Sequence, residues 1–178
     1  MRQFLILYLY VSLMFFSSMV LADDSITKIL NLSAHIENND FFSYKVTKFD
    51  FVVPELTIKY NYETEQFDSA STEVVLETDV PLSFPAGFEL IATDLSSYCE
   101  DASGAVLAHD FANYFYDGKK LVRESSLSFD SFNNSYHPDA FFLNDKRLFT
   151  VSFNSIPGLD VSKAYCQGAA TLVVSLDL

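Results

Sequence analysis

The chain has 178 residues, 49% of them hydrophobic, and a formal net charge of −13 at pH 7. This length fits a single domain with its own hydrophobic core. The negative charge repels the phosphate backbone of nucleic acids and anionic membrane surfaces, so nucleic acid is excluded as an expected partner.

Residues 1–22 have the pattern of a secretory signal peptide. Arg2 precedes an apolar run over residues 4–16, and small residues follow up to Ala22. The apolar run is shorter than the ~20 residues that a membrane-spanning helix needs. We therefore expect cleavage after Ala22, and export of residues 23–178, rather than a membrane anchor.

The next segment alternates apolar and polar residues as a strand does. Successive side chains of a strand point to opposite faces, so one apolar row forms, interrupted at Lys28. The row consists of Ile26, Leu30, Leu32, Ala34 and Ile36. Such a row needs an apolar groove to cover it.

Strand patterns also dominate the rest of the chain, and helical periodicity is scarce. Turn-forming Pro, Gly, Asn and Asp residues, including the pair Asp117 and Gly118, separate the strands. The expected strands cover residues 44–53, 56–62, 72–78, 88–95, 106–111, 120–129, 147–153 and 169–178. We expect an all-β fold, an immunoglobulin-like antiparallel β-sandwich, with a barrel as the alternative.

The chain beyond the signal peptide contains two cysteines, Cys99 and Cys166. Exported proteins meet an oxidising compartment, where an even number of cysteines usually pairs. We expect one disulfide between them. A metal site would need more thiols or clustered histidines, and a single nucleophilic cysteine would leave the other unexplained.

The sequence offers no convincing catalytic or metal-binding pattern. His35, His109 and His137 each have an acidic residue close in sequence, but no G-x-S-x-G nucleophile motif accompanies them. The polar runs at 37–40 and 130–134 lack the ligand order of a calcium-binding loop, and turn formation accounts for them. We expect no enzyme activity, no cofactor and no metal.

Five segments, in this order along the chain, resemble segments of a known family. They are 31–37, 54–60, 66–69 leading into 74–76, 104–107, and 165–168 leading into 172–176. In order and spacing they are similar to the major pilins of class 5 fimbriae, also called alpha or coli-surface-antigen-one type, of the alternate chaperone-usher pathway. The segment from residue 111 to 154 and the paired cysteines depart from this pattern.

The resemblance implies a fimbrial structural subunit that polymerises by donor-strand exchange and supports adhesion. Residues 23–36 would be the donor strand and residues 37–178 an incomplete sandwich, whose groove the strand of an adjoining copy fills. The implied groove residues are Leu56, Ile58, Tyr60, Leu172, Val174 and Leu176. The implied partners are further copies in a homopolymer, a periplasmic chaperone, an outer-membrane usher and a tip adhesin, on a route through the periplasm to the cell surface.

Two other functions stay open at this point. One is a secreted β-sandwich module whose aromatic segment, residues 111–153, binds a carbohydrate or a protein; a monomer that pairs its own first strand internally would favour it. The other is a hydrolase on a β-sandwich with His109 or His137 as the base, which the missing nucleophile motif disfavours.

Overall fold

The computed structural model describes residues 28–36 and 44–178, so the expected signal peptide and Ile26 lie outside the described residues. The described part consists of strands and turns, and it contains no helix long and apolar enough to cross a membrane. The strands are β1 Lys28–Ile36, β2 Val46–Phe51, β3 Glu55–Ile58, β4 Tyr60–Asn61, β5 Gln66–Phe67, β6 Ala70–Pro81, β7 Gly87–Glu100, β8 Val106–His109, β9 Ala112–Tyr116, β10 Lys119–Lys120, β11 Ser126–Phe129, β12 Phe142–Phe153 and β13 Tyr165–Asp177.

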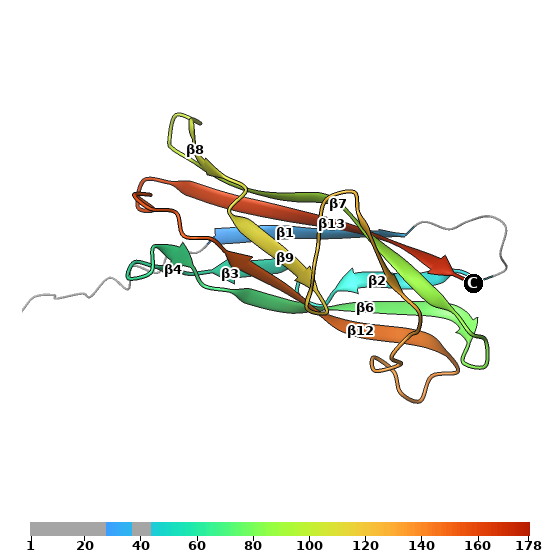
Figure 1. The fold of residues 1–178 in the computed structure, drawn as a ribbon. Coiled ribbons are helices and arrows are strands. Elements are labelled where there is room, and N and C mark those ends of the chain that lie inside the picture. The colour runs from blue at the N-terminus through green and yellow to red at the C-terminus, as the bar shows by residue number, and fades with distance from the viewer. Residues whose placement is uncertain (1–27, 37–43) are drawn as a thin grey trace, which may run out of the picture.

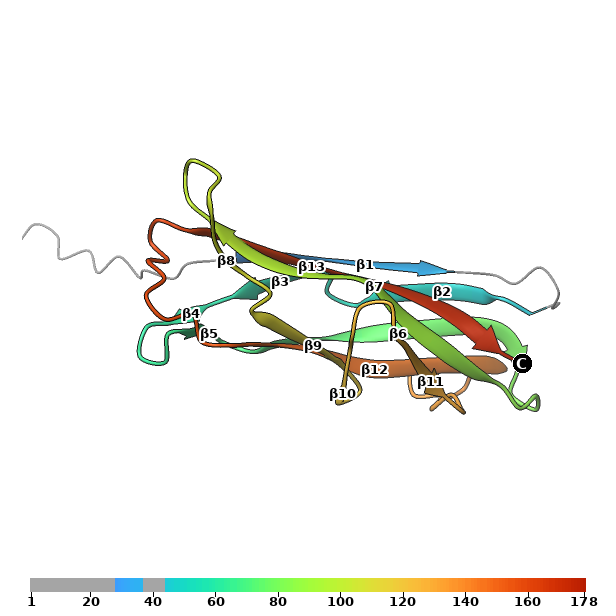
Figure 2. The ribbon, with the colours of Figure 1, turned by 45° about the horizontal axis from the view of Figure 1, so that its top comes forward.

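Two sheets pack face to face (Figures 1 and 2). The first has the order β11-β7-β13-β1-β3, with β8 paired to β7, and the second has the order β10-β9-β12-β6-β2. Strands β4 and β5 form a separate hairpin. The fold is therefore the all-β sandwich expected from the sequence, and not the alternative barrel.

The core lies between the two sheets because alternate residues of each strand face inward. On β13, Ala170, Leu172 and Val174 are fully buried, and the residues between them are only partly buried. On β12 of the opposite sheet, Phe149 and Val151 are likewise fully buried. The sequence pattern predicted this inward face of β13 correctly.

The region expected as one strand at 120–129 is divided between β10, which ends at Lys120, and β11. Before it the chain forms β9, which was not among the expected strands, and then turns at Asp117 and Gly118, whose φ angles are 51° and 74°. Left-handed angles at both central residues favour a two-residue hairpin, and Asp-Gly suits it. Strand β9 therefore pairs with both β10 and β12.

The aromatic segment from 111 to 153 mainly faces inward. Its buried rings are Phe111, Tyr114, Tyr116, Phe129, Phe132 and Phe149. Phe129 stacks on Phe88 of β7 with ring centroids 4.9 Å apart. Most of these aromatic side chains therefore build the core and are unavailable to a ligand.

Arg147 and Asp145 of β12 form an ion pair inside the sandwich. The side chain of Asp145 is fully buried, and the side chain of Arg147 is 13% exposed. Arg147 donates from Nε and Nη2 to the two carboxylate oxygens of Asp145, at 2.8 and 3.0 Å, and from Nη1 to Asp117 at 2.6 Å. The guanidinium lies 4.4 Å from the ring centre of Phe129. Burial raises the pKa of Asp145, and the hydrogen bonds from Arg147 oppose that shift.

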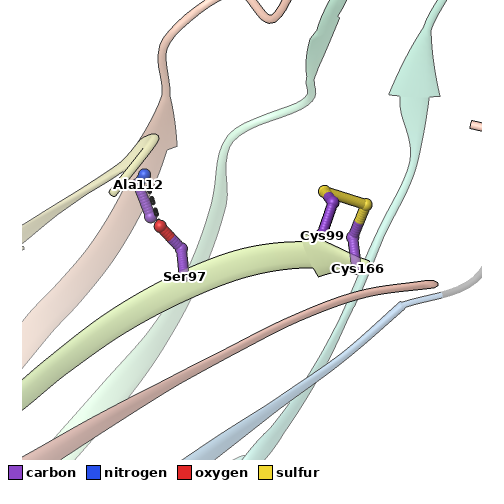
Figure 3. Close-up of a disulfide and its surroundings, with 4 residues drawn as sticks. All are labelled: Ser97, Cys99, Ala112 and Cys166. Atoms are coloured by element: carbon purple, nitrogen blue, oxygen red, sulfur yellow. Dashed lines mark hydrogen bonds between the residues drawn. A yellow bond between two sulfur atoms is a disulfide. The ribbon is translucent and has the colours of Figure 1, made fainter. Parts of the chain in front are cut away.

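The disulfide between Cys99 and Cys166 forms as expected (Figure 3). The two residues are direct register partners on β7 and β13, so the bond joins neighbouring strands of one sheet. It differs in this respect from the bridge between sheets in true immunoglobulin domains. Both residues are buried, at 0% and 3% exposure, which makes the bond part of the core.

Replacing Cys99 and Cys166 together by serine should lower the free energy of unfolding by about 2–5 kcal/mol, because the cross-link constrains the unfolded chain. Urea unfolding of the variant and the natural protein measures the difference. A change below about 0.5 kcal/mol would contradict a structural role for the bond.

Replacing Arg147 by alanine should cost about 3–5 kcal/mol, because it leaves the buried Asp145 carboxylate without its main partner. Arg147→Met combined with Asp145→Leu should cost less, since no uncompensated charge remains. Chemical denaturation of both variants measures this. A single variant that is as stable as the natural protein would show that the ion pair is dispensable.

Candidate functional site

Strand β1 lies between β3 and β13, the two strands that carry most of the expected groove residues (Figure 1). It pairs with β13 from Leu30 opposite Gly168 to Ile36 opposite Val174, and this is the one parallel ladder among the described strands. On its other side it pairs antiparallel with β3, from Lys28 to Asn31. In the single chain, the sheet expected to be incomplete is therefore completed by the chain's own first strand.

Leu30 is the most deeply seated of the described side chains of β1, at 3% exposure. Its register partner Gly168 makes room for it, because a Cβ atom at residue 168 would lie 2.8 Å from Leu30 Cδ1 and 2.8 Å from the carbonyl oxygen of Ser96. On the other side of β1, Leu56 of β3 faces Leu30 in register. The site that holds Leu30 therefore has Gly168, which lacks a side chain, on one flank and the apolar side chain of Leu56 on the other.

Tyr114 lies beside the site that holds Leu30 and lines it together with Gly168. Its hydroxyl donates a hydrogen bond of 2.5 Å to the carbonyl oxygen of Ser96. Burial raises the pKa of Tyr114, so its phenol keeps the proton that it donates. The Tyr114 hydroxyl and the Ser96 carbonyl oxygen, the polar groups beside Leu30, therefore satisfy each other by this hydrogen bond.

A small apolar cavity of about 20 Å³ adjoins Leu30. Side chains from both sheets and from the β4–β5 hairpin surround it, and apolar surface makes up nearly all of its wall. It is lined by Leu30, Ile58, Phe67, Ser97, Phe111, Tyr114, Phe153, Cys166, Gln167 and Gly168. The buried disulfide therefore forms part of the wall of the groove.

The second half of β1 is held less firmly than the first. Leu32 and Ala34 are only partly buried, although both pack against the core. Strand β3 ends its pairing at Asn31, and Leu32 N then donates to Pro54 O at 3.2 Å. Beyond that point no described strand pairs with the outer edge of residues 33–36.

Of the predicted groove residues, Leu56, Ile58, Leu172 and Val174 lie on the two strands that flank β1, opposite its residues. Leu176 lies on β13 beyond Val174, the last partner of β1.

Tyr60 lies elsewhere. It belongs to β4, outside the sheet that contains β1, and its ring packs on Phe67 with centroids 5.1 Å apart. Strand β3 ends at Ile58, and the single residue Lys59 separates it from β4, so the strand is shorter than the alternation in the sequence suggests.

Gly168 and Ala170, which face Leu30 and Leu32, are not among the predicted groove residues. A glycine inside an apolar strand marks a close approach by another backbone or side chain. Gly168 carries that signal in the sequence.

The histidines and acidic groups form no catalytic or metal-binding arrangement within the described residues. His109 and Asp110 contact each other at 2.8 Å, but both are largely exposed. The acidic neighbour of His137 is Glu77, at 3.8 Å. No group of three or more His, Cys, Asp or Glu residues in the described part could hold a metal ion, and the side chain of His35 lies outside that part.

No family model matches the chain, and a search of curated proteins finds no match. Among solved structures, the chain is similar to the CooA pilin subunit from enterotoxigenic Escherichia coli, with 9% sequence identity and a TM-score of 0.40. The matched region covers 65% of this chain and 86% of that chain.

Leu30→Ala should lower the free energy of unfolding by about 2–5 kcal/mol, because it empties a tightly packed site next to an existing cavity. The matched control is Leu148→Ala on β12, where the side chain is 51% exposed and truncation should change little. Urea unfolding compares the two. Equal effects would show that Leu30 does not anchor β1.

Proposed function

We propose that the chain is a structural subunit of a bacterial surface fimbria, and that β1 leaves its own groove to enter the groove of an adjoining copy. Residues 23–36 then act as the donor strand and residues 37–178 as the body that accepts a strand. The subunit has a structural role and no enzyme activity. The assembled fibre supports adhesion at the cell surface.

The observation that carries this proposal is the position of β1. It is a terminal strand, its partners β3 and β13 belong to the rest of the chain, and residues 37–43 connect it to β2. A second copy carries an identical strand, and the groove that holds β1 in the single chain offers that strand a backbone edge and an apolar wall.

The groove offers a donor strand both main-chain and side-chain binding. When β1 has left the groove, the free edge of β13 supplies backbone hydrogen bonds that set the register of the incoming strand. The apolar wall of the groove selects the side chains of that strand. Burial of a large apolar side chain such as Leu30 contributes roughly 1.5–3 kcal/mol. Without a strand, the groove exposes unpaired backbone groups and apolar surface, which promotes aggregation.

Those properties of the open groove also support the partners that the family resemblance implies. A periplasmic chaperone would cover the groove before assembly, an outer-membrane usher would bring subunits together, and a tip adhesin would end the fibre. The roles of Leu56, Ile58, Leu172 and Val174 as acceptor residues belong to the same proposal.

One observation favours a second function. Because β1 occupies its own groove, the single chain has a complete sheet and no open slot. A stable monomer of this kind suits a secreted β-sandwich module that binds a carbohydrate or a protein.

A lock on β1 distinguishes the two functions without disturbing the core. Ser33 and Thr171 are register partners whose hydroxyl oxygens lie 2.6 Å apart on the outer face of the sheet. The variant Ser33→Cys with Thr171→Cys should form a disulfide that holds β1 in its own groove. We expect monomers when it is oxidised and fibres after mild reduction, observed by electron microscopy.

Ser33→Ala with Thr171→Ala is the matched control, because it removes the same contact without a lock and should assemble normally. Peptide mapping of the oxidised variant verifies that the new bond joins residues 33 and 171. Fibres from fully locked protein would refute strand transfer. A natural protein that remains monomeric in its own secretion system would favour the binding module.

A further inference from the structure

Large apolar side chains are exposed together at one end of the sandwich. Exposure reaches 85% at Phe141, 47% at Leu82 and Phe142, and 37% at Phe84. Tyr44 is partly buried beside them. We call Tyr44, Leu82, Phe84, Phe141 and Phe142 the exit patch.

The exit patch is one continuous surface, although its residues come from three parts of the chain. Leu82 N donates to Phe141 O at 3.2 Å, which joins the β6–β7 turn to the start of β12. The rings of Tyr44 and Phe84 are in contact, with centroids 5.4 Å apart. Exposed apolar surface of this kind usually marks an interaction site.

The exit patch lies where β1 ends and β2 begins. Ile36 pairs with Val174 near the end of β13, and Figures 1 and 2 show the C-terminus at the same end of the molecule as the β6–β7 turn. Tyr44 of the patch directly precedes the residues that lead into β2. A β1 strand that enters another copy is therefore still covalently tied to this end of its own body.

The length of the segment that connects β1 to its own body limits how far away the acceptor copy can lie. Residues 37–43 are seven residues, and seven residues of fully extended chain span at most about 25 Å. The acceptor copy must then lie against the end that carries the exit patch. We infer, on the basis of the proposed function, that the exit patch is the docking surface for the copy that accepts β1.

The direction in which β1 enters the acceptor determines which surface meets the patch. Entry parallel to β13, as in the single chain, brings Ile36 to the acceptor's own patch end and gives a closed two-fold pair. Reversed entry brings Ile36 to the opposite end, where Val106 and Leu107 of β8 are 61% and 49% exposed. Only the second contact is head-to-tail and can propagate, so the exit patch docks on the β8 end of the next copy.

A membrane is the other possible occupant of an aromatic surface. The net charge of −13 disfavours it, because anionic lipid headgroups repel a strongly acidic protein. The second copy carries the same charge, but it is held close by the inserted strand.

The test compares fibre assembly by three variants of the full chain. Phe84→Ser with Phe141→Ser removes the patch, Val106→Ser with Leu107→Ser removes the facing surface, and Leu148→Ser is an exposed control away from both ends. We expect at least tenfold fewer fibres from the first two, counted by electron microscopy. The control should assemble normally, and all monomers should melt within a few degrees of the natural protein.

Normal fibres from the patch variant, or discrete dimers as the end product of the natural protein, would overturn the inference. So would loss of fibres from the patch variant alone, because head-to-tail docking needs both surfaces. Binding of phosphatidylcholine vesicles that requires Phe141, with unchanged assembly, would assign the patch to lipid instead. The lock between residues 33 and 171 reports on strand transfer separately, so failure of the patch leaves that result unaffected.

Discussion

The seating of Leu30 opposite Gly168 is the contact on which the groove depends. It brings the first described strand into register with the last one, and it places Leu30 between β13 and β3. Because Gly168 has no side chain, the leucine approaches the sheet closely enough to be buried. Removal of β1 would leave the facing edges of β3 and β13 without a pairing partner, and it would expose the interior beside the disulfide.

This arrangement divides β1 into two parts with different roles. The first part is anchored by Leu30 and paired on both sides, whereas the second part pairs with β13 alone among the described strands. A parallel ladder is also slightly less stable per residue than an antiparallel one. A strand held firmly at one end and loosely at the other can be displaced progressively from the loose end, which is next to the exit patch.

The rest of the core also has supports that lie outside β1. Strand β7 pairs with β13 over its whole length, and the Cys99–Cys166 bond fixes that pair. On the second sheet, the ion pair of Arg147 with Asp145 joins the aromatic segment to the interior. The body therefore has its own structural supports, which suits the strand exchange that we propose.

The strands with clear alternation, the inward face of β13, the Asp-Gly turn and the pairing of the only two cysteines could be predicted from the amino-acid sequence alone. These depend on local geometry or on counting, since a strand reverses its side chains at every residue. Other features follow from the folded chain and not from local alternation. Tyr60 lies outside the groove because it pairs with Phe67 in the β4–β5 hairpin. Gly168 is the partner of Leu30, and β1 runs parallel to β13 within its own chain, because segments more than 100 residues apart come into contact. The exit patch likewise exists only because the fold brings Tyr44, the β6–β7 turn and the start of β12 to one end.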